Sequence, residues 1–599
     1  MHYQVAMPKP QLHLFEVTLF VKDWHQPILD VKMPVWTPGS YLVREYTKHL
    51  QGFSAASGNR QPLPWRKLAK NHWQIETADT SEIEINYCVF ANELTVRTNH
   101  LDATHGYFNG AALFFFIEGH QQQPIQVKIV PPHQEWRITT PLPRIPGKSN
   151  SFLAADFDTL VDSPFEIGCQ QLYEFEVLGI PHQLAIWGKG NANPQRIIDD
   201  IKKIIEVEAK LYGGLPYEKY LFLLHLAANN FGGLEHKNAC SLIYPRFNFR
   251  TQDNYNRFLQ LVAHEFFHLW NVKRIRPKAL EVFDYERENY TSSLWFCEGT
   301  TSYYDLFIPL RAKIYDAKTF LEALSKEISK FQNTPGRQVQ SLSESSFDAW
   351  IKLYRRDANS DNSQISYYLK GEMVSLLLDL LIRARYQNQR SLDDVMRQMW
   401  QQFGKEEIGY TPKQLRRVIE SVVGCDLSNF FDNYINGTAE LPFNEYLEPF
   451  GLQLIGVEEG EPINCKPKGS RYSLKGSLQL IGVEEGEPIP FLGIITKTDN
   501  SQELIKFVEA GSPAGLAGVD AGDQLLAIDG LRVAAGQLSD RLKDYSPGDT
   551  IEVSLFHHDQ LCTLAVTLAP PRPSRCKIVQ LKNPTEVQKQ NLCGWLGIA

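Results

Sequence analysis

A histidine–glutamate–histidine pattern near the middle of this 599-residue chain has residue types and a spacing that suit metal-assisted chemistry. It reads His264-Glu265-Phe266-Phe267-His268, in a segment that predicts a helix. Side chains four residues apart project from one face of a helix, so His264 and His268 could share one Zn²⁺ ion. Glu265 could then reach the water that the ion activates and serve as a general base. The pattern predicts the core of a zinc hydrolase with one ion per chain.

The neighbours of this pattern indicate that its helix is buried. Apolar residues occupy nearly all sides of the two histidines: Leu261, Val262, Phe266, Phe267, Leu269 and Trp270. Two imidazoles and a carboxylate inside such a helix need partners, because unpaired buried polar groups are costly. A metal ion would satisfy all three, which favours a zinc site over an ordinary surface helix.

A third protein ligand is expected, since catalytic zinc usually has three such ligands and one open position. Glu298 is the best candidate, because it is a lone carboxylate in an apolar, aromatic segment that predicts a second buried helix. The aromatic residues around it are Trp295, Phe296, Tyr303 and Tyr304. The alternative is a structural ion pair between Glu298 and Arg274 or Arg276.

Composition excludes several functional classes. The net charge is −8 with both signs mixed along the chain, so no basic patch predicts nucleic-acid binding. The longest apolar run, 373–382, includes Asp379 and is too short to span a bilayer. The start of the sequence lacks the features of a secretory signal, and the nine cysteines are scattered without C-x-x-C pairs. These features predict a soluble cytoplasmic protein with no membrane partner.

Residues 1–166 predict an all-β domain, because apolar and polar residues alternate in segments such as 12–21 and 82–90. Within this domain, the segment 33–46, which includes Trp36-Thr37-Pro38-Gly39-Ser40-Tyr41, crowds aromatic residues around two prolines and a glycine. It is either a packed connection between strands or part of the active-site rim.

Residues 167–450 predict the catalytic domain. Strands at 182–187 and 220–226 flank an amphipathic helix that begins at Asn193-Pro194, and helices dominate from 310 to 448. The strand at 220–226 leads into Gly232-Gly233-Leu234-Glu235, which could line a cleft, although a glycine pair is more often only a turn.

Residues 451–489 predict a linker, because a twelve-residue segment at 452–463 recurs identically at 478–489. A segment that occurs only twice does not indicate a solenoid, because a solenoid needs more repeat units. We interpret it as a tandem duplication, natural or artefactual, that lengthened the linker.

Residues 490–569 look like a PDZ domain. The loop Phe491-Leu492-Gly493-Ile494 would offer backbone N–H groups to the carboxylate of a peptide C-terminus, beside an exposed strand edge. The alternative is a groove that is structural or filled by the protein's own chain. Residues 570–599 predict a C-terminal tail that starts with a stiff proline-rich spacer and docks back through Trp595-Leu596.

Together these features resemble the glycyl aminopeptidase family, zinc peptidases related to aminopeptidase N that carry an added PDZ domain. The resemblance covers nearly the whole chain and rests on 35–41, the H-E-x-x-H helix, Trp295-x-x-Glu298-Gly299 and the PDZ segment. It implies a multidomain α+β protein: an N-terminal β-sandwich, a thermolysin-like zinc peptidase domain with a helical lobe, and a C-terminal PDZ domain.

The resemblance also implies roles for single residues. Glu298 becomes the third zinc ligand. The segment Gly232-Gly233-Leu234-Glu235 is similar to the G-x-M-E-N strand of the relatives, so Glu235 would hold the free amine of the substrate. Tyr368 lies in a segment similar to their Y-x-K-G motif and would stabilise the oxyanion, with Tyr367 as its rival.

This chain departs from that pattern at two places. Thirty positions separate His268 from Glu298, more than in aminopeptidase N, and Leu234 and His236 replace the Met and Asn of its motif. The predicted function is a zinc aminopeptidase acting on peptides, with a preference for N-terminal Gly or Ala that follows from the family name alone. The alternatives are a zinc endopeptidase that recruits substrates through its PDZ groove, and a non-catalytic PDZ-bearing binding protein.

Overall fold

The computed structural model describes residues 1–77, 80–457, 489–573 and 575–598. It contains two compact units, one formed by residues 1–291 and 396–415 and the other by residues 292–395 and 416–599. The helices α9 (Leu392–Met399) and α10 (Pro412–Val423) each contain a point where the chain passes from one unit to the other.

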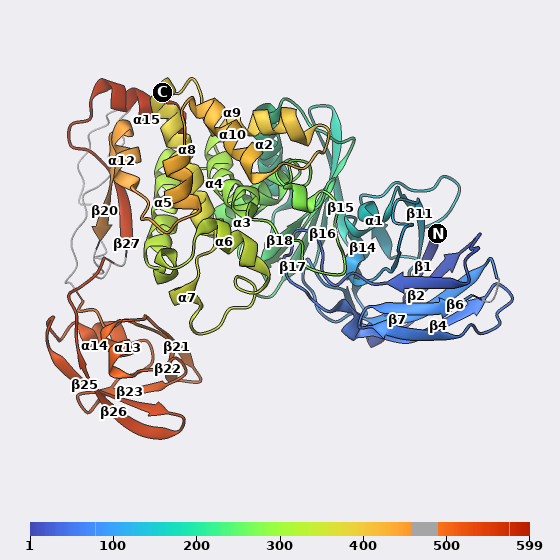
Figure 1. The fold of residues 1–599 in the computed structure, drawn as a ribbon, viewed down its shortest axis with the longest axis horizontal. Helices are drawn as coiled ribbons and strands as arrows, with labels where there is room; N and C mark the ends of the chain where they lie inside the picture. Colours follow the sequence, from blue (N-terminus) through green and yellow to red (C-terminus); the bar gives the residue numbers. More distant parts are fainter. Residues whose placement is uncertain (78–79, 458–488, 574, 599) are drawn as a thin grey trace. The chain divides into compact units, whose positions relative to one another are not determined.

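The first unit begins with β-sheets (Figure 1), and strands such as His2–Ala6 and Ile83–Phe90 alternate fully buried with more exposed residues. A six-stranded sheet has the order β13-β11-β1-β2-β7-β4, with strands Ser151–Ala154, Ile125–Val130, His2–Ala6, Leu14–Val21, Ile83–Phe90 and Leu50–Ser57. A second sheet has the order β10-β3-β6-β5, with strands Phe116–Ile117, Ile28–Lys32, His72–Glu76 and Trp65–Ala69. This part of the chain is the expected N-terminal β-rich domain.

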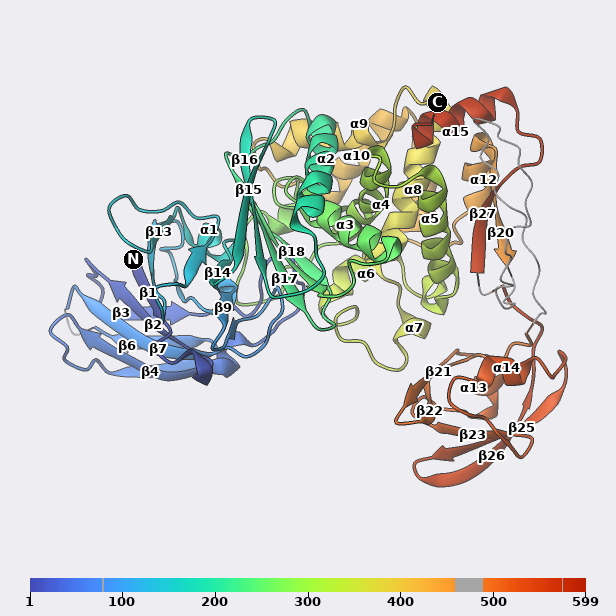
Figure 2. The ribbon, with the colours of Figure 1, turned by 180° about the vertical axis from the view of Figure 1, so that it is seen from behind.

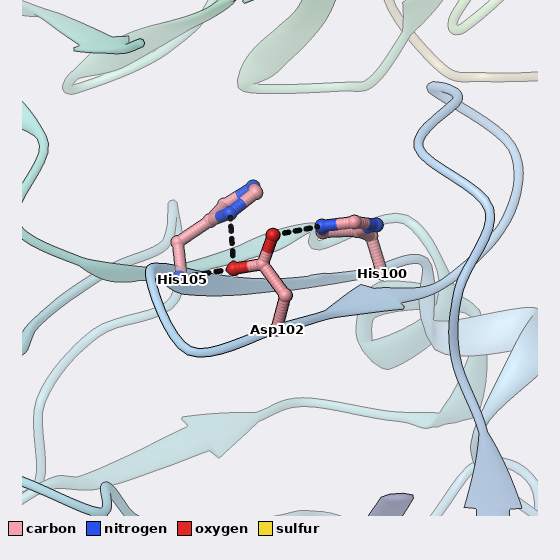
Figure 3. Close-up of side chains that lie close together, drawn as sticks. All are labelled: His100, Asp102 and His105. Carbon is pink, nitrogen blue, oxygen red and sulfur yellow. Dashed lines mark hydrogen bonds and ion pairs between the residues drawn. The ribbon is translucent and has the colours of Figure 1, made fainter. Parts of the chain in front are cut away.

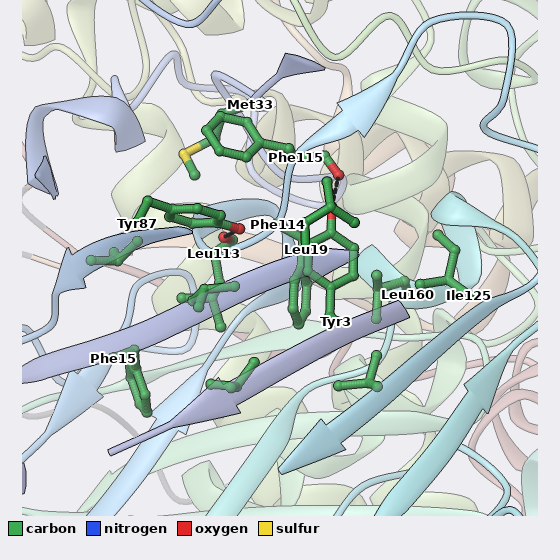
Figure 4. Packing of buried hydrophobic residues seen from close by; sticks show 14 of the residues in the cluster. Tyr3, Phe15, Leu19, Met33, Tyr87, Leu113, Phe114, Phe115, Ile125 and Leu160 are labelled. Atoms are coloured by element: carbon green, nitrogen blue, oxygen red, sulfur yellow. Dashed lines mark hydrogen bonds between the residues drawn. The ribbon is translucent and has the colours of Figure 1, made fainter. Parts of the chain in front are cut away.

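An apolar core fills the β-rich domain, and Figure 4 shows its large aromatic side chains. Tyr3 is fully buried beside Phe114, and its hydroxyl donates to the Phe115 carbonyl at 2.6 Å. The Tyr87 hydroxyl donates to the Leu113 carbonyl at 2.9 Å. The polar ends of these rings therefore have partners, as buried tyrosines require.

A third small sheet, β12-β14-β9-β8, follows, with strands Arg137–Thr139, Phe165–Gly168, His105–Phe108 and His100–Leu101. The short helix α1 (Phe157–Val161), capped by Asp156, precedes β14, so the region predicted to be all-β also contains an α-helical turn, besides short 3₁₀ turns. Strand β14 crosses the predicted domain boundary at 166/167.

A five-stranded mixed sheet comes next in the chain and precedes the H-E-x-x-H helix (Figure 2). Its order is β15-β16-β17-β19-β18, with strands Gln171–Val177, Ile180–Trp187, Tyr220–Ala227, Ala239–Pro245 and Gly232–Glu235. The three central strands are parallel, and both edge strands run antiparallel to their neighbours. The fully buried β17 fits its continuous apolar sequence.

Two helices pack against this sheet. Helix α2 (Pro194–Tyr212) begins with Asn193 as its cap, as predicted, and buries its isoleucines. Helix α3 (Gln252–Phe267) is capped by Thr251, whose side chain accepts from the Asn254 N–H, and it contacts β18 and β19. The edge strand β18 and the end of α3 thus come together, and these two elements carry the predicted amine-binding and metal-binding residues.

The second unit is mainly helical up to residue 447. Its helices include α4 (Thr300–Arg311), α5 (Ala317–Gln332), α6 (Leu342–Phe347), α7 (Ser360–Ser363), α8 (Tyr367–Tyr386), α11 (Ser428–Phe430) and α12 (Phe443–Leu447). Helix α8 is buried along most of its length, and Asp379 within it accepts from the Tyr303 hydroxyl at 2.6 Å and pairs with Arg383 at 2.8 Å. The run 373–382 is therefore part of a core helix, as its Asp379 suggested.

The C-terminal part contains more regular structure than the predicted linker and tail. Strand β20 (Leu452–Val457) holds the first half of the first repeat copy and pairs antiparallel with β27 (Arg575–Gln580). Helix α15 (Glu586–Leu596) follows, and Trp595 packs against Phe320 and Phe450, so the tail does dock. Most of the duplicated segment, residues 458–488, lies outside the described residues.

The segment predicted to be a PDZ domain forms a separate sheet with its own apolar core. The order is β21-β22-β23-β25-β26, with strands Ile494–Asp499, Gln502–Val508, Gln524–Ile528, Thr550–His557 and Gln560–Thr567. The short strand β24 (Leu531–Arg532) pairs with β23, and the helices are α13 (Pro513–Ala517) and α14 (Leu538–Leu542). Within the described residues, no helix is both long and apolar enough to span a bilayer.

Candidate active site

The two histidines of the H-E-x-x-H pattern lie at the C-terminal end of α3. Their ring centroids are 4.6 Å apart, and the ring planes are nearly perpendicular. His268 is 1% exposed, and its Nδ1 lies 2.7 Å from the carbonyl oxygen of Asn271. An Nδ1–H that donates to this carbonyl leaves Nε2 as the atom with a lone pair, which is how proteins fix the tautomer of a metal-binding histidine.

Glu265 is buried between the helix and the edge strand. Ligand atoms of Glu235, Glu265 and His268 all lie within 4.8 Å of one another. Burial raises the pKa of Glu265 to about 7, and the nearby Glu235 adds to this, although His264 and His268 act in the opposite direction. In the described part of the chain, Glu265 Oε2 has no hydrogen-bond partner. The geometry leaves this oxygen available for a water or a substrate proton.

The glycine pair of β18 gives Glu265 its position. A Cβ on Gly233 would lie 2.1 Å from Oε1 of Glu265 and 2.2 Å from its Cδ, so no larger residue fits beside this carboxylate. The Arg97 guanidinium donates to the Gly233 carbonyl at 3.0 Å and fixes the strand from the other side. The Gly-Gly pair is therefore more than a turn, because it lets a strand backbone approach the predicted base.

Glu235 ends the same strand, with 4% of its surface exposed. A Cβ on Gly39 would lie 2.6 Å from both carboxylate oxygens of Glu235, so the aromatic loop of the N-terminal domain touches this residue directly. A pocket beside them is lined by Trp36, Pro38, Gly39, Tyr41, Glu235, Val272, Lys273, Arg276, Leu280 and Phe283. The loop is thus a packed segment, with Trp36 and Tyr41 at most 1% exposed, that also touches Glu235.

Asp162, which the sequence did not single out, fastens the segments that follow Glu235 and α3. Its carboxylate accepts from Lys273 Nζ at 2.6 Å and from the Lys237 backbone N–H at 2.7 Å, and it lies 3.3 Å from His236 Nδ1. Burial alone would raise the pKa of Asp162, but Lys273 and His236 outweigh this and hold the pKa well below its ordinary value. No sequence pattern could have revealed this residue, because its partners lie 74 or more positions away.

In the second unit, Glu298 lies in a π-helical turn, Trp295–Gly299, that leads into α4. The turn packs closely on the start of α8, since a Cβ on Gly299 would lie 2.4 Å from the Cα of Gly371. Glu298 is 1% exposed. The glycine of the Tyr368-Leu369-Lys370-Gly371 segment is thus required by close packing beside the predicted ligand, and π-turns are frequent at functional sites.

Tyr368 and Tyr367 open helix α8, and their rings stack at 4.8 Å. Their hydroxyls lie 3.2 Å and 3.3 Å from the hydroxyl of Tyr354, which sequence reasoning missed. Burial, together with the charge of Glu298, raises the pKa of Tyr368 well above its ordinary value. The Tyr368 hydroxyl therefore keeps its proton at neutral pH and can donate a hydrogen bond.

The two arginines offered as structural partners of Glu298 are held within the first unit. Arg276 pairs with Glu407 at 3.1 Å. Arg274 donates to the backbone carbonyls of Leu269, Pro216 and Lys237 at 2.8–3.1 Å. These contacts give both guanidiniums a role that does not involve Glu298.

Two family models and a solved structure match this chain. The family described as Peptidase M61 N-terminal domain matches residues 2–169, and the family described as M61 glycyl aminopeptidase matches residues 257–374. A crystal structure of an aminopeptidase N family protein from Idiomarina loihiensis is 32% identical, with a TM-score of 0.90 over 99% of both chains. The chain belongs to the M61 glycyl aminopeptidase family.

Membership of the M61 family identifies the protein as a peptidase, as predicted, and the family match at 257–374 includes the H-E-x-x-H helix, Glu298 and Tyr368. An M1 zinc metallopeptidase from Deinococcus radiodurans is 12% identical, with a TM-score of 0.48 over 74% of this chain and 95% of its own. Comparison with curated protein sequences finds no match. The two family matches do not extend to 490–569, so the PDZ domain stays a prediction.

Proposed function

We propose that this M61 peptidase is a zinc aminopeptidase that removes N-terminal residues, with small residues such as Gly and Ala preferred. The observation that carries the proposal is the closeness of Glu235 to Glu265 and His268, whose ligand atoms all lie within 4.8 Å of one another. In a substrate, the α-amino nitrogen and the first carbonyl carbon are only about 2.5 Å apart. An ammonium group held by Glu235 would therefore bring the first peptide bond to Glu265.

His264, His268 and Glu298 are the proposed ligands of one zinc ion. Together they offer two imidazole nitrogens and one carboxylate oxygen, a donor set that suits Zn²⁺ in catalytic sites. The contact between His268 Nδ1 and the Asn271 carbonyl supports the fit, because it directs Nε2 to ligation. When bound, the ion would supply Lewis acidity toward the substrate carbonyl and lower the pKa of water to about 7.

Side chains of the protein would supply the proton transfer, the oxyanion hydrogen bond and the substrate binding. Glu265 accepts a proton from the attacking water and returns it to the leaving amine, and its buried position next to Gly233 holds it for this step. The Tyr368 hydroxyl donates to the developing oxyanion. Glu235 pairs with the substrate ammonium, with Gly232 and Gly233 beside it as the backbone of the amine-binding strand.

The finer parts of the fold are proposals of the same kind. We assign residues 490–569 to a PDZ domain and the N-terminal sheets to a β-sandwich, with a thermolysin-like arrangement in the catalytic domain. The loop Phe491–Ile494 has Gly493 at φ = 87° and leads into the edge strand β21, which supports capture of a peptide C-terminus there. The rival functions are an endopeptidase that recruits substrates through this groove and a PDZ-bearing binding protein without activity.

One experiment separates these functions. Zinc content is measured together with hydrolysis of Gly-, Ala- and Leu-anilides and of their N-acetylated forms, before and after chelation and zinc return. An aminopeptidase cleaves the free-amine anilides only in the zinc-loaded form. Cleavage of the acetylated forms at equal rates would favour the endopeptidase, and no hydrolysis by the zinc-loaded protein would favour the binding protein.

The Glu235→Ala variant tests the amine anchor in the same assay. We expect kcat/KM on free-amine anilides to fall by about 100-fold, because removing a charged partner in a buried site costs roughly 2–3 kcal/mol. Activity on the acetylated forms should stay at its low starting level. Equal losses on both substrate types would contradict the role of Glu235.

A further inference from the structure

A second cluster of potential metal ligands lies in the first unit, outside the candidate active site. His105, Glu166 and His225 come from three different strands, β9, β14 and β17. Each offers one ligand atom, and these atoms all lie within 4.8 Å of one another. All three side chains are at most 1% exposed. The cluster joins strands of the N-terminal domain to the central strand of the catalytic sheet.

Several polar atoms of this cluster have no hydrogen-bond partner among the described residues. They are His105 Nε2, His225 Nδ1 and Glu166 Oε1. Among the described residues, one hydrogen bond joins two of these three side chains, between His225 Nε2 and Glu166 Oε2 at 2.7 Å. Buried polar groups in folded proteins nearly always have partners, so three such atoms in one buried place point to a missing ligand.

Asp102 lies between His105 and His100 and contacts both, as Figure 3 shows. Its Oδ1 is 3.8 Å from His105 Nδ1 and accepts from the Thr104 N–H and hydroxyl and from the His105 N–H, at 2.6–3.1 Å. Its Oδ2 lies 3.1 Å from His100 Nε2. Both oxygens of Asp102 thus have partners. Asp102 therefore suits the role of a residue that orients the ligand His105, and it is not itself a proposed metal ligand.

Aromatic rings enclose the cluster. The Trp187 ring stacks on His105 with centroids 3.6 Å apart, and Tyr107 meets His225 edge-on at 4.7 Å. Gly168 leaves the room that His105 needs, since a Cβ there would lie 2.8 Å from the His105 Cβ. Such an apolar shell limits water access and strengthens the interaction of charged ligands with a cation.

We propose that His105, Glu166 and His225 bind a divalent transition-metal ion of the zinc type, which fastens the N-terminal β-domain to the catalytic sheet. Ligand atoms at about 2.0–2.2 Å from a tetrahedral ion lie roughly 3.4 Å apart. The separations here, from 2.7 Å to at most 4.8 Å, bracket that value. Two imidazoles and a carboxylate, with water as a fourth ligand, match the preferences of Zn²⁺ better than those of Ca²⁺ or Mg²⁺.

The test counts metal ions in the full-length protein. Wild type, His264→Ala/His268→Ala and His225→Ala are loaded with Zn²⁺, desalted and measured by mass spectrometry of the metal. We expect two ions per chain in wild type and one in each variant. His72→Ala is the control, because His72 also contacts a carboxylate, that of Asp30, but lies outside the cluster, and this variant should keep two ions.

The His264→Ala/His268→Ala variant decides the outcome even if His225→Ala fails to fold, because it leaves the new site intact. In that variant, Zn²⁺ should raise Tm and chelation should lower it, and Co²⁺ should give the visible bands of a tetrahedral site. Less than a tenth of an ion per chain and no Zn²⁺-dependent shift in Tm would overturn the proposal. One ion in both wild type and this variant would instead overturn the peptidase zinc site and keep the new one.

Discussion

The close contact between Gly233 and Glu265 gives a sharp test of the proposed base. In Gly233→Ala, the new Cβ would lie 2.1 Å from Glu265 Oε1, whereas real Cβ contacts under 3.0 Å are essentially never seen. The strand is held by Arg97 and by its pairing with β19, so the Glu265 carboxylate is the part that must move. The shift that relieves the contact is about 1 Å.

A displacement of this size has a predictable cost. Misplacing a catalytic group by about 1 Å lowers the rate by roughly 100-fold, or about 2.7 kcal/mol in the activation free energy. The contact extends to Glu265 Cγ, which would lie 2.4 Å from the new Cβ, so the whole side chain must rotate away and Tm should fall as well. Gly233→Ala should still be folded, bind zinc and hydrolyse Gly- and Ala-anilides about 100-fold more slowly than wild type.

Two further variants serve as comparisons for Gly233→Ala. Glu265→Gln keeps the shape of the side chain but removes the base, and it should lose about two to three orders of magnitude in kcat while keeping zinc. Gly58→Ala is the matched control, since its Cβ would meet only the exposed Glu82 side chain at 2.9 Å, and its kcat should stay within twofold of wild type. A Gly233→Ala enzyme with kcat within threefold of wild type and an unchanged Tm would refute the reasoning, as would near-normal hydrolysis by Glu265→Gln.

Two other predictions concern the second unit. Tyr368→Phe should lower kcat on Ala-anilide by about 100-fold, because one oxyanion donor contributes on that scale. The kcat of Tyr367→Phe should stay within a few-fold of wild type. The opposite ranking of the two variants would assign the role to Tyr367. Trp595→Ala should lower the free energy of unfolding by about 3–5 kcal/mol, since Trp595 is 2% exposed and packs on Phe320 and Phe450. Urea denaturation measures this, with the exposed Val587→Ala as control; a loss below about 1 kcal/mol would show that α15 does not support the helical core.

Local patterns along the chain were sufficient to predict many elements. The cap and proline at Asn193-Pro194 mark the start of α2, and the run 220–226 lies in the buried strand β17. Alternation over 12–21 predicts β2, which begins at Leu14. Such signals are readable because capping, helical period and strand alternation depend only on residues a few positions apart.

Local sequence patterns did not predict one pair of strands that joins distant segments of the chain. The predicted linker and tail contain β20 and β27, which pair with each other although more than a hundred residues separate them. Neither strand is recognisable alone, since Leu452 and Ile578 are buried only after the ladder forms and packs on α5. Sheet order and register come from tertiary packing, which short windows of sequence do not contain.

The sequence alone was sufficient to predict the family and to propose its chemistry, from two histidines and a glutamate at helical spacing and from the segments around Glu298 and Tyr368. Only the tertiary structure decided what surrounds them. It placed Gly39 against Glu235, joined Asp162 to Lys273, and brought His105 and Glu166 to His225. The physical reason is the separation along the sequence. A helix brings together residues four positions apart, whereas the residues in these contacts are 59 to 196 positions apart and meet only when sheets and loops pack.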